Sequence, residues 1–161
     1  MKVIRNLQIT ATEFFDAVFD EIIQEIEGLD KTKISKDSLK TGFHYVHTGK
    51  TAYDKVEFKI VEYQEEQFYK CVRSSIRGIT TLSYEVVSKE DGITVTFIHD
   101  TDIPGAQAKK KGLSTFFTEG YMLGRMTDKL YSYQNKVMDK KEGYITKEYG
   151  NPLIPTIRRK K

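Results

Sequence analysis

The stretch that decides the fold class is VEFKIVEYQEEQFYKCVRSSIRGITTLSYEVVSKEDGITVTFIH, residues 56–99. Apolar side chains recur there at every second position, and turn signals interrupt the alternation at residues 64–67, Arg77-Gly78 and Asp91-Gly92. This pattern is typical of an antiparallel meander with one buried face and one solvated face. With a further turn signal at Thr48-Gly49, we expect the meander to extend from about Leu39 to Asp102.

The turns also predict which side chains face inward, because a shift of one residue in strand register exchanges the two faces of a sheet. A two-residue loop at Asp91-Gly92 places Tyr84 opposite His99, and three-residue loops at residues 77–79 and 65–67 continue the same face over the two earlier strands. The predicted inner face then holds Val56, Phe58, Ile60, Val72, Ser74, Ile76, Leu82, Tyr84, Val86, Val95, Phe97 and His99. The predicted outer face is mostly solvated and carries Arg73 and Arg77, with Cys71 packed against it as a small apolar residue.

Two helices and one strand are expected around the meander. Residues 3–9 alternate as a half-buried strand, and Thr10 with Glu13 forms a capping box for a helix that we expect to end at Gly28. A long helix is expected from Leu113 to Lys140 and must cover the sheet. The face predicted to do so comprises Leu113, Phe117, Gly120, Gly124, Thr127, Leu130, Tyr131, Gln134 and Val137.

Length and composition exclude several classes of protein. The chain has 161 residues and 18.6 kDa, with 39% hydrophobic and 30% charged residues, which indicates one globular domain. The 26 basic and 23 acidic residues give a net charge of +3, too balanced to indicate nucleic acid as a partner. A single cysteine, no signal peptide and no long apolar run predict a cytoplasmic protein without a transmembrane segment. We expect one domain over residues 1–140 and an extended appendage over 141–161 that ends in a basic tail.

The order of strand, helix, antiparallel strands and long C-terminal helix resembles the helix-grip fold over about residues 1–140. This superfamily, also called SRPBCC, contains START lipid-binding domains, polyketide cyclases and birch-pollen-type allergens. The segments Val3–Arg5, Thr10–Asp16 and Gly120–Gly124 are similar to a family of uncharacterised Gram-positive bacterial proteins that carry a domain of unknown function. The resemblance implies an α+β fold in which a curved antiparallel sheet of about six or seven strands wraps on the long helix. It also implies a pocket between sheet and helix that often holds a small hydrophobic molecule.

The two glycines within the long helix need a reason, because glycine costs about 1 kcal/mol against alanine inside a helix. Either they let the helix approach the sheet closely, or they leave room for a ligand. For the second alternative we expect the ligand to contact Phe58, Val72, Ser74, Tyr84, Phe97, His99, Phe117, Gly120, Gly124 and Thr127.

Tyr84 and His99 are the only candidates for catalysis, as an acid-base pair on the inner face, and they could instead hydrogen-bond each other as core residues. His44 and His47 lie three positions apart on a predicted strand and so point to opposite faces. With three histidines and one cysteine, we expect no metal site and no cofactor.

Three functions remain open from the sequence. The first is a non-enzymatic domain that binds a small hydrophobic molecule, and the second is a cyclase or hydrolase that uses His99 and Tyr84 in the same pocket. The third is a domain with a filled core that acts through a protein partner or a homodimer, using the Tyr-rich appendage or the basic tail.

Overall fold

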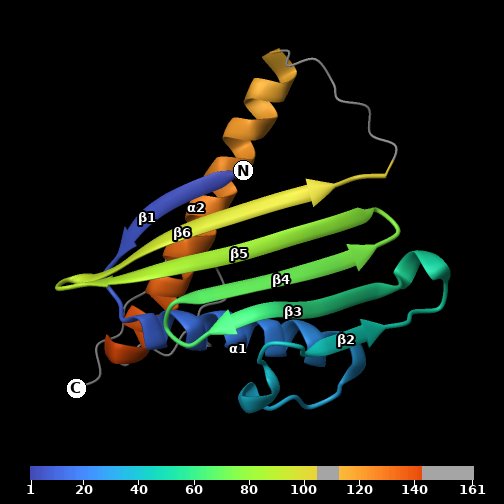
Figure 1. Cartoon of the computed structure of the whole chain (residues 1–161), viewed down its shortest axis with the longest axis horizontal. Helices are drawn as coiled ribbons and strands as arrows, with labels where there is room; N and C mark the ends of the chain where they lie inside the picture. The colour runs from blue at the N-terminus through green and yellow to red at the C-terminus, as the bar shows by residue number, and fades with distance from the viewer. Residues whose placement is uncertain (105–112, 143–161) are drawn as a thin grey trace.

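Six strands form one antiparallel sheet in the order β1-β6-β5-β4-β3-β2, and both long helices lie on the same side of it (Figure 1). The computed structural model describes residues 1–104 and 113–142, with side chains for all of these except Ala52 and residues 113–117. The elements are β1 (Lys2–Leu7), α1 (Ala11–Asp30), η1 (Lys36–Ser38), β2 (His44–His47), η2 (Ala52–Asp54), β3 (Val56–Gln64), β4 (Phe68–Ser75), β5 (Gly78–Lys89), β6 (Gly92–Asp102) and α2 (Leu113–Glu142). The α+β helix-grip fold is therefore confirmed. Of the predicted appendage over 141–161, Lys141 and Glu142 belong to α2, and residues 143–161 lie outside the described residues.

Helix α1 begins where its sequence predicts. The Thr10 side chain accepts from the Glu13 backbone N–H, and the Glu13 carboxylate accepts from the Thr10 N–H, which completes the capping box. The helix continues past Gly28, contrary to the prediction, and ends at Asp30, where Lys31 adopts a left-handed backbone with φ of 56°. Apolar residues at helical spacing, among them Phe14, are buried under the sheet.

The hairpin between β5 and β6 keeps the predicted faces but not the predicted partners. Lys89 pairs with Gly92, so the turn is Glu90-Asp91 and the register moves by two residues. Tyr84 consequently lies opposite Phe97, and His99 lies opposite Leu82. Because the shift is an even number of residues, every side chain of the two strands keeps its face.

The hairpin between β4 and β5 exchanges the predicted faces of β4. Ser75 pairs with Gly78 across a two-residue turn, one residue shorter than the predicted loop. Tyr69, Cys71 and Arg73 therefore face the helices, and the prediction that Val72, Ser74 and Ile76 face inward is wrong. The assignment of Cys71 and Arg73 to the outer face is wrong for the same reason.

Strand β3 keeps Phe58 and Ile60 on the inner face as predicted. Its three-residue loop to β4 is confirmed by the pairing of Gln64 with Phe68. The pairing of β3 with β4 then shifts by one residue between Ile60 and Glu62. Because of this shift, Phe58 pairs with Arg73, and both inner faces agree although the turn after β4 is one residue shorter than predicted.

Helix α2 covers the sheet with a face that only partly matches the predicted one, since Leu130 and Val137 were expected there but Met126 and Tyr133 were not. Met126, Leu130, Tyr133 and Val137, spaced by four, three and four residues, are its buried side chains. Gly120 and Gly124 are exposed, and a Cβ added to either would meet no atom of another described element within 4 Å. The first turns of α2 extend past the edge of the sheet in Figure 1. Because both glycines are exposed and no sheet atom lies close to either, they do not serve to bring the helix closer to the sheet.

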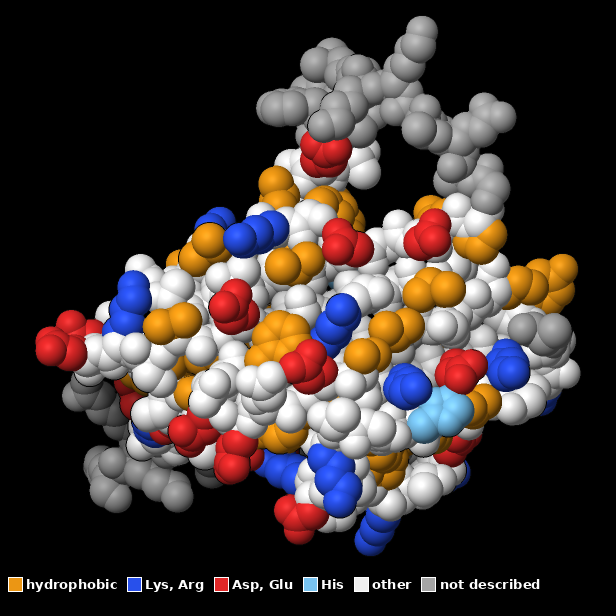
Figure 2. Space-filling view, in the orientation of Figure 1, with side chains coloured by type: hydrophobic (Ala, Val, Ile, Leu, Met, Phe, Trp, Pro, Cys, Tyr) orange, Lys and Arg blue, Asp and Glu red, His pale blue; other side chains and the backbone are white. Residues whose placement is uncertain are grey.

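No helix of residues 1–104 or 113–142 covers the outer face of the sheet (Figure 1). Figure 2 shows this face with apolar side chains scattered among charged and polar ones. Exposed apolar residues include Ile4, Val87 and Ile79, each about half exposed. Single apolar residues of this kind are normal on protein surfaces.

Candidate functional site

A cleft opens between the inner face of the sheet, α1 and α2. Its volume is about 650 Å³. It is lined by Glu21 of α1, by Arg73, Thr80, Leu82, Phe97 and His99 of strands β4 to β6, and by Met122, Arg125, Met126, Asp128, Lys129 and Ser132 of α2. This is the place between sheet and C-terminal helix where the helix-grip fold was expected to hold its pocket.

The floor of the cleft is apolar. Phe97 and Met126 are almost completely buried, and Leu82 and Met122 are half-buried beside them. Underneath, Tyr84 packs against Phe97 with ring centroids 4.7 Å apart and against Phe14 with centroids 5.3 Å apart. Methionine is unbranched and adapts its shape readily, so a floor of this composition suits an apolar guest.

The charged side chains at one end of the cleft are paired. The Arg73 guanidinium donates to both carboxylate oxygens of Glu25, at 2.8 and 2.7 Å, and lies 5.5 Å from the centre of the Phe58 ring. The Lys129 ammonium lies 2.7 Å from the Glu21 carboxylate. These two ion pairs connect β4 and α2 to α1, so the acidic partners come from a helix that the sequence pattern did not connect with the site.

Four buried polar atoms on the inner face of the sheet have no hydrogen bond of good geometry among the described residues, although the Tyr69 hydroxyl interacts with Cys71 and the Tyr84 hydroxyl with Tyr133. They are Arg73 Nε, His99 Nδ1, and the hydroxyls of Tyr69 and Tyr84. Tyr69 pairs across the strands with Tyr84, and the remaining two residues line the cleft directly. Burial raises the pKa of both tyrosines well above the ordinary value, so their hydroxyls stay protonated.

His99 is uncharged near neutral pH. Burial, together with the positive chain terminus at Met1, lowers its pKa below the ordinary 6.5. The Met1 amino group donates to the His99 carbonyl at 2.9 Å and also bonds to Asp100. An uncharged imidazole can either donate or accept at Nδ1.

The structure brings together only part of the predicted ligand site. Phe97 and His99 line the cleft, with Tyr84 beneath its floor and Phe58 against Arg73. Thr127 lies next to the cleft residues on α2, but its hydroxyl accepts a hydrogen bond from Arg5 at 2.9 Å.

The remaining predicted residues lie elsewhere. Val72 and Ser74 are on the outer face, Gly120 and Gly124 are exposed, and the side chain of Phe117 lies outside the described residues. Tyr84 and His99 are not cross-strand partners, so the proposed acid-base pair does not form as predicted.

The cleft also contains residues that the sequence pattern did not indicate. Met122 and Met126 were not predicted because the stripe of α2 that contains the glycines is equally regular. Arg73 was not predicted because the turn after β4 was expected to have three residues and has two. Nothing local in the sequence marks Glu21 or Lys129 as cleft residues.

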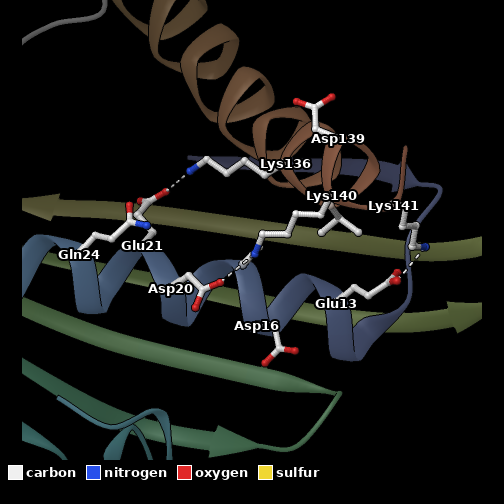
Figure 3. Close-up of a pocket in the computed structure, with 11 residues that line it drawn as sticks. Glu13, Asp16, Asp20, Glu21, Gln24, Lys136, Asp139, Lys140 and Lys141 are labelled. Atoms are coloured by element: carbon white, nitrogen blue, oxygen red, sulfur yellow. Dashed lines mark hydrogen bonds and ion pairs between the residues drawn. The ribbon is translucent and has the colours of Figure 1, made fainter. Parts of the chain in front are cut away.

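A second hollow, of about 390 Å³, lies between α1 and α2 and has a different character. Figure 3 shows lysines of α2 reaching carboxylates of α1 across it. Lys141 lies 2.7 Å from Glu13, and Lys140 lies 3.3 Å from Asp20. These ion pairs attach the end of α2 to α1, and the charged lining does not suit an apolar molecule.

The described part of the chain offers neither a metal site nor a membrane-spanning helix. Residues 1–104 and 113–142 contain no cluster of three or more His, Cys, Asp or Glu side chains that could hold a metal ion. Neither of the helices in those ranges is long and apolar enough to cross a bilayer.

Comparisons with known proteins support the fold and give no activity. A family model described as a domain of unknown function, DUF3284, matches residues 1–118. No curated protein matches the chain.

Solved structures share the fold at low sequence identity. Ara h 8.0201 has a TM-score of 0.56 at 9% identity, over 86% of this chain and 97% of that one. A protein of unknown function from Staphylococcus aureus, SA2116, has a TM-score of 0.55 at 10% identity, over 88% and 93% of the two chains. The Aha1 dimer from Colwellia psychrerythraea has a TM-score of 0.54 at 10% identity, over 85% and 94%. At such identities the likeness shows the fold alone.

Proposed function

The chain belongs to the family of the domain of unknown function DUF3284, and from this premise we propose that it binds a small hydrophobic molecule in the cleft between the sheet and α2. The observation that carries the proposal is the apolar floor formed by Leu82, Phe97, Met122 and Met126, with a few polar groups at its edges. Small-molecule sites in proteins are typically hollows of about 300–1,000 Å³ with this kind of lining. The volume of about 650 Å³ falls within that range.

We also propose the bounds of the ligand-binding domain, its cellular compartment and its assembly. We place the ligand-binding unit at residues 1–140 of a bacterial, cytoplasmic protein that is not an enzyme, with the segment after Lys140 as an appendage. The description of the Colwellia protein as a dimer supports a homodimer as the assembly to look for first.

The test places a large side chain inside the cleft. The matched control places the same side chain at the neighbouring position of β5, on the outer face of the sheet. Thr80 lines the cleft, whereas Thr81, the next residue of β5, faces the outer side. The uncharged fluorescent probe N-phenyl-1-naphthylamine should bind the wild type and Thr81→Trp with similar affinity. Thr80→Trp should bind it at least about ten-fold more weakly, a change of about 1.4 kcal/mol.

Native mass spectrometry of the protein purified from its own cells supplies the natural ligand and the subunit count. A mass adduct in the wild type and in Thr81→Trp, lost in Thr80→Trp, would support the proposal. Equal probe binding by the two variants would remove this cleft as the site.

A further inference from the structure

A third hollow lies at the end of the sheet where β1 meets the turn between β5 and β6. Its volume is about 880 Å³, and it shares no lining residue with the cleft. It is lined by Asn6, Leu7, Gln8, Lys89, Glu90, Asp91, Gly92 and Ile93, and by Tyr131 and Gln134 of α2. Leu7 and Ile93 are almost completely buried, so the lining is polar and aromatic apart from these two residues and Gly92.

The three walls of this hollow are fixed to one another. A Cβ at Gly92 would collide with the Leu7 carbonyl oxygen, so the first residue of β6 lies directly against the end of β1. The backbone N–H of Gln8 donates to Oε1 of Gln134 at 2.6 Å and connects α2 to the same place. A ligand therefore meets walls that are already ordered, which lowers the entropic cost of binding.

The amide side chains of the hollow are oriented donors. A backbone N–H can only donate, so Gln134 must turn its amide oxygen toward Gln8 and its NH₂ group away. The amide oxygen of Asn6 likewise accepts from the Thr94 hydroxyl at 2.8 Å. Neither NH₂ group donates to an acceptor among the described residues. Both are thus free to donate to a ligand.

The turn supplies acceptors, and α2 supplies an aromatic ring. The carboxylates of Glu90 and Asp91 form no ion pair or hydrogen bond with the described part of the chain. Tyr131 is 39% exposed and is the aromatic residue of the lining. The hollow therefore combines oriented donors, free acceptors and an accessible ring face.

This combination matches the chemistry of a sugar. Each sugar hydroxyl both donates and accepts hydrogen bonds, so it can pair with the amides and with the carboxylates. The C–H groups on one face of a pyranose ring form an apolar surface that can stack on a tyrosine ring. An apolar guest would instead cover the amides and carboxylates without pairing them, which costs free energy.

We propose that this hollow binds an uncharged pyranose sugar, with one face of the sugar against Tyr131 and its hydroxyls between the amides of Asn6 and Gln134 and the carboxylates of Glu90 and Asp91. The site goes beyond the proposed function and does not depend on it, because the hollow and the cleft have no lining residue in common.

Titration of the ¹⁵N-labelled full chain followed by NMR tests the site. The probes are methyl glucoside, methyl galactoside, methyl mannoside, maltose, cellobiose and lactose. At least one of them should shift the backbone amide signals of Glu90, Asp91 and Gly92 in a saturable manner. Sorbitol, which has hydroxyls but no ring face, should not do so at the same concentration. If none of the six sugars shifts these signals, the inference is overturned.

Two exposed tyrosines of α2 provide the variant and its matched control. Tyr131→Ala should weaken binding of the best sugar about five-fold or more, the scale of one aromatic contact, whereas Tyr131→Phe should retain most of it. Tyr121, 64% exposed, lies outside the hollow, so Tyr121→Ala should bind the sugar as the wild type does. Unchanged affinity in Tyr131→Ala, or an equal loss in both alanine variants, would overturn the inference.

The readouts keep the two hollows apart. N-Phenyl-1-naphthylamine, the probe of the cleft, should bind Tyr131→Ala and the wild type equally, so failure of the sugar site leaves the proposed function standing. Circular dichroism checks the fold of Tyr131→Ala. If that variant does not fold, Asp91→Ala in the exposed turn is the second test and should also weaken sugar binding, and an unchanged affinity there would overturn the inference.

Discussion

The buried Tyr84 hydroxyl gives the sharpest test of the sheet register. Tyr84 is 1% exposed, and its hydroxyl forms no hydrogen bond of good geometry among the described residues, although it interacts with the Tyr133 hydroxyl. Its ring is fixed by Phe14, Phe97 and Tyr133, with centroid distances of 5.3, 4.7 and 6.4 Å. Tyr84→Phe removes the hydroxyl and retains every ring contact. We therefore expect this substitution at a core position to stabilise the protein.

The magnitude follows from two opposing effects. A buried hydroxyl without a partner costs about 1–3 kcal/mol, and phenylalanine removes that cost. The space left by one oxygen atom costs a few tenths of a kcal/mol, at about 24 cal/mol per Å³ of cavity. The free energy of unfolding should rise by about 1 kcal/mol, which corresponds to a rise in Tm of roughly 2–4 °C for a protein of this size.

Urea unfolding followed by circular dichroism measures the change, with Tyr45→Phe as the matched control. The Tyr45 hydroxyl donates to Asp30, and burial together with that carboxylate raises the pKa of Tyr45 to about 12. Because this hydroxyl has a partner, Tyr45→Phe should lower stability, opposite in sign to Tyr84→Phe. A loss of more than about 1 kcal/mol in Tyr84→Phe would refute the reasoning, since it would show that the hydroxyl is hydrogen-bonded in the folded protein.

Three further substitutions have expected outcomes that unfolding experiments can check. Burial lowers the pKa of His99 in the folded state, so the unfolded chain takes up the proton first as pH falls through 6.5. The wild type should lose stability from pH 7.5 to 5.0, and His99→Leu should lose less over the same interval. Gly124→Ala should raise the free energy of unfolding by about 0.5–1 kcal/mol, because the position is helical and open, and a loss would show an unseen packing partner. Gly78→Ala should lower it by about 2 kcal/mol or more, because φ is 136° and a Cβ would collide with the Asp102 carbonyl oxygen, whereas a neutral result would disprove the tight turn.

The local signals in the sequence were sufficient for most of the fold. The Thr10–Glu13 capping box marks the start of α1 because both of its hydrogen bonds are made within four residues. The alternation in β5 and β6 places Tyr84 and Phe97 inward even though their partners were assigned two positions away. The face on which a side chain lies changes only when the register is wrong by an odd number of residues. An error of two residues therefore leaves the predicted faces correct.

The face of β4 could not be predicted, because it depends on whether the turn before β5 has two residues or three. Arg73 increased the error, since a charged residue in a strand normally indicates the solvated face. It lies on the inner face because Glu25, 48 positions away on α1, accepts two hydrogen bonds from its guanidinium. A partner so distant in the chain leaves no signal in the local pattern.

The face of α2 that meets the sheet could not be predicted either, because two faces of the helix carry residues at regular helical spacing. One contains Gly120 and Gly124, the other contains Met126 and Tyr133, and Leu130 and Val137 are common to both. Periodicity detects both stripes but does not say which one meets the sheet, and the helix begins beyond the edge of the sheet, where only its later turns are covered. The choice is made by packing against Tyr84 and Phe97, residues that the sequence itself did place correctly.

The register of β4 also decides the chemistry of the cleft. With the predicted register, Val72 and Ser74 would face α2 and offer an alkyl group and a small hydroxyl. With the observed register, the same face presents Arg73, whose guanidinium is paired with the Glu25 carboxylate. The two-residue turn that sets this register needs the positive φ of Gly78, far from the apolar floor. A glycine outside the cleft lining thus determines which side chains of β4 face α2, and a turn longer by one residue should replace Arg73 by its neighbours on that face and break the ion pair with Glu25.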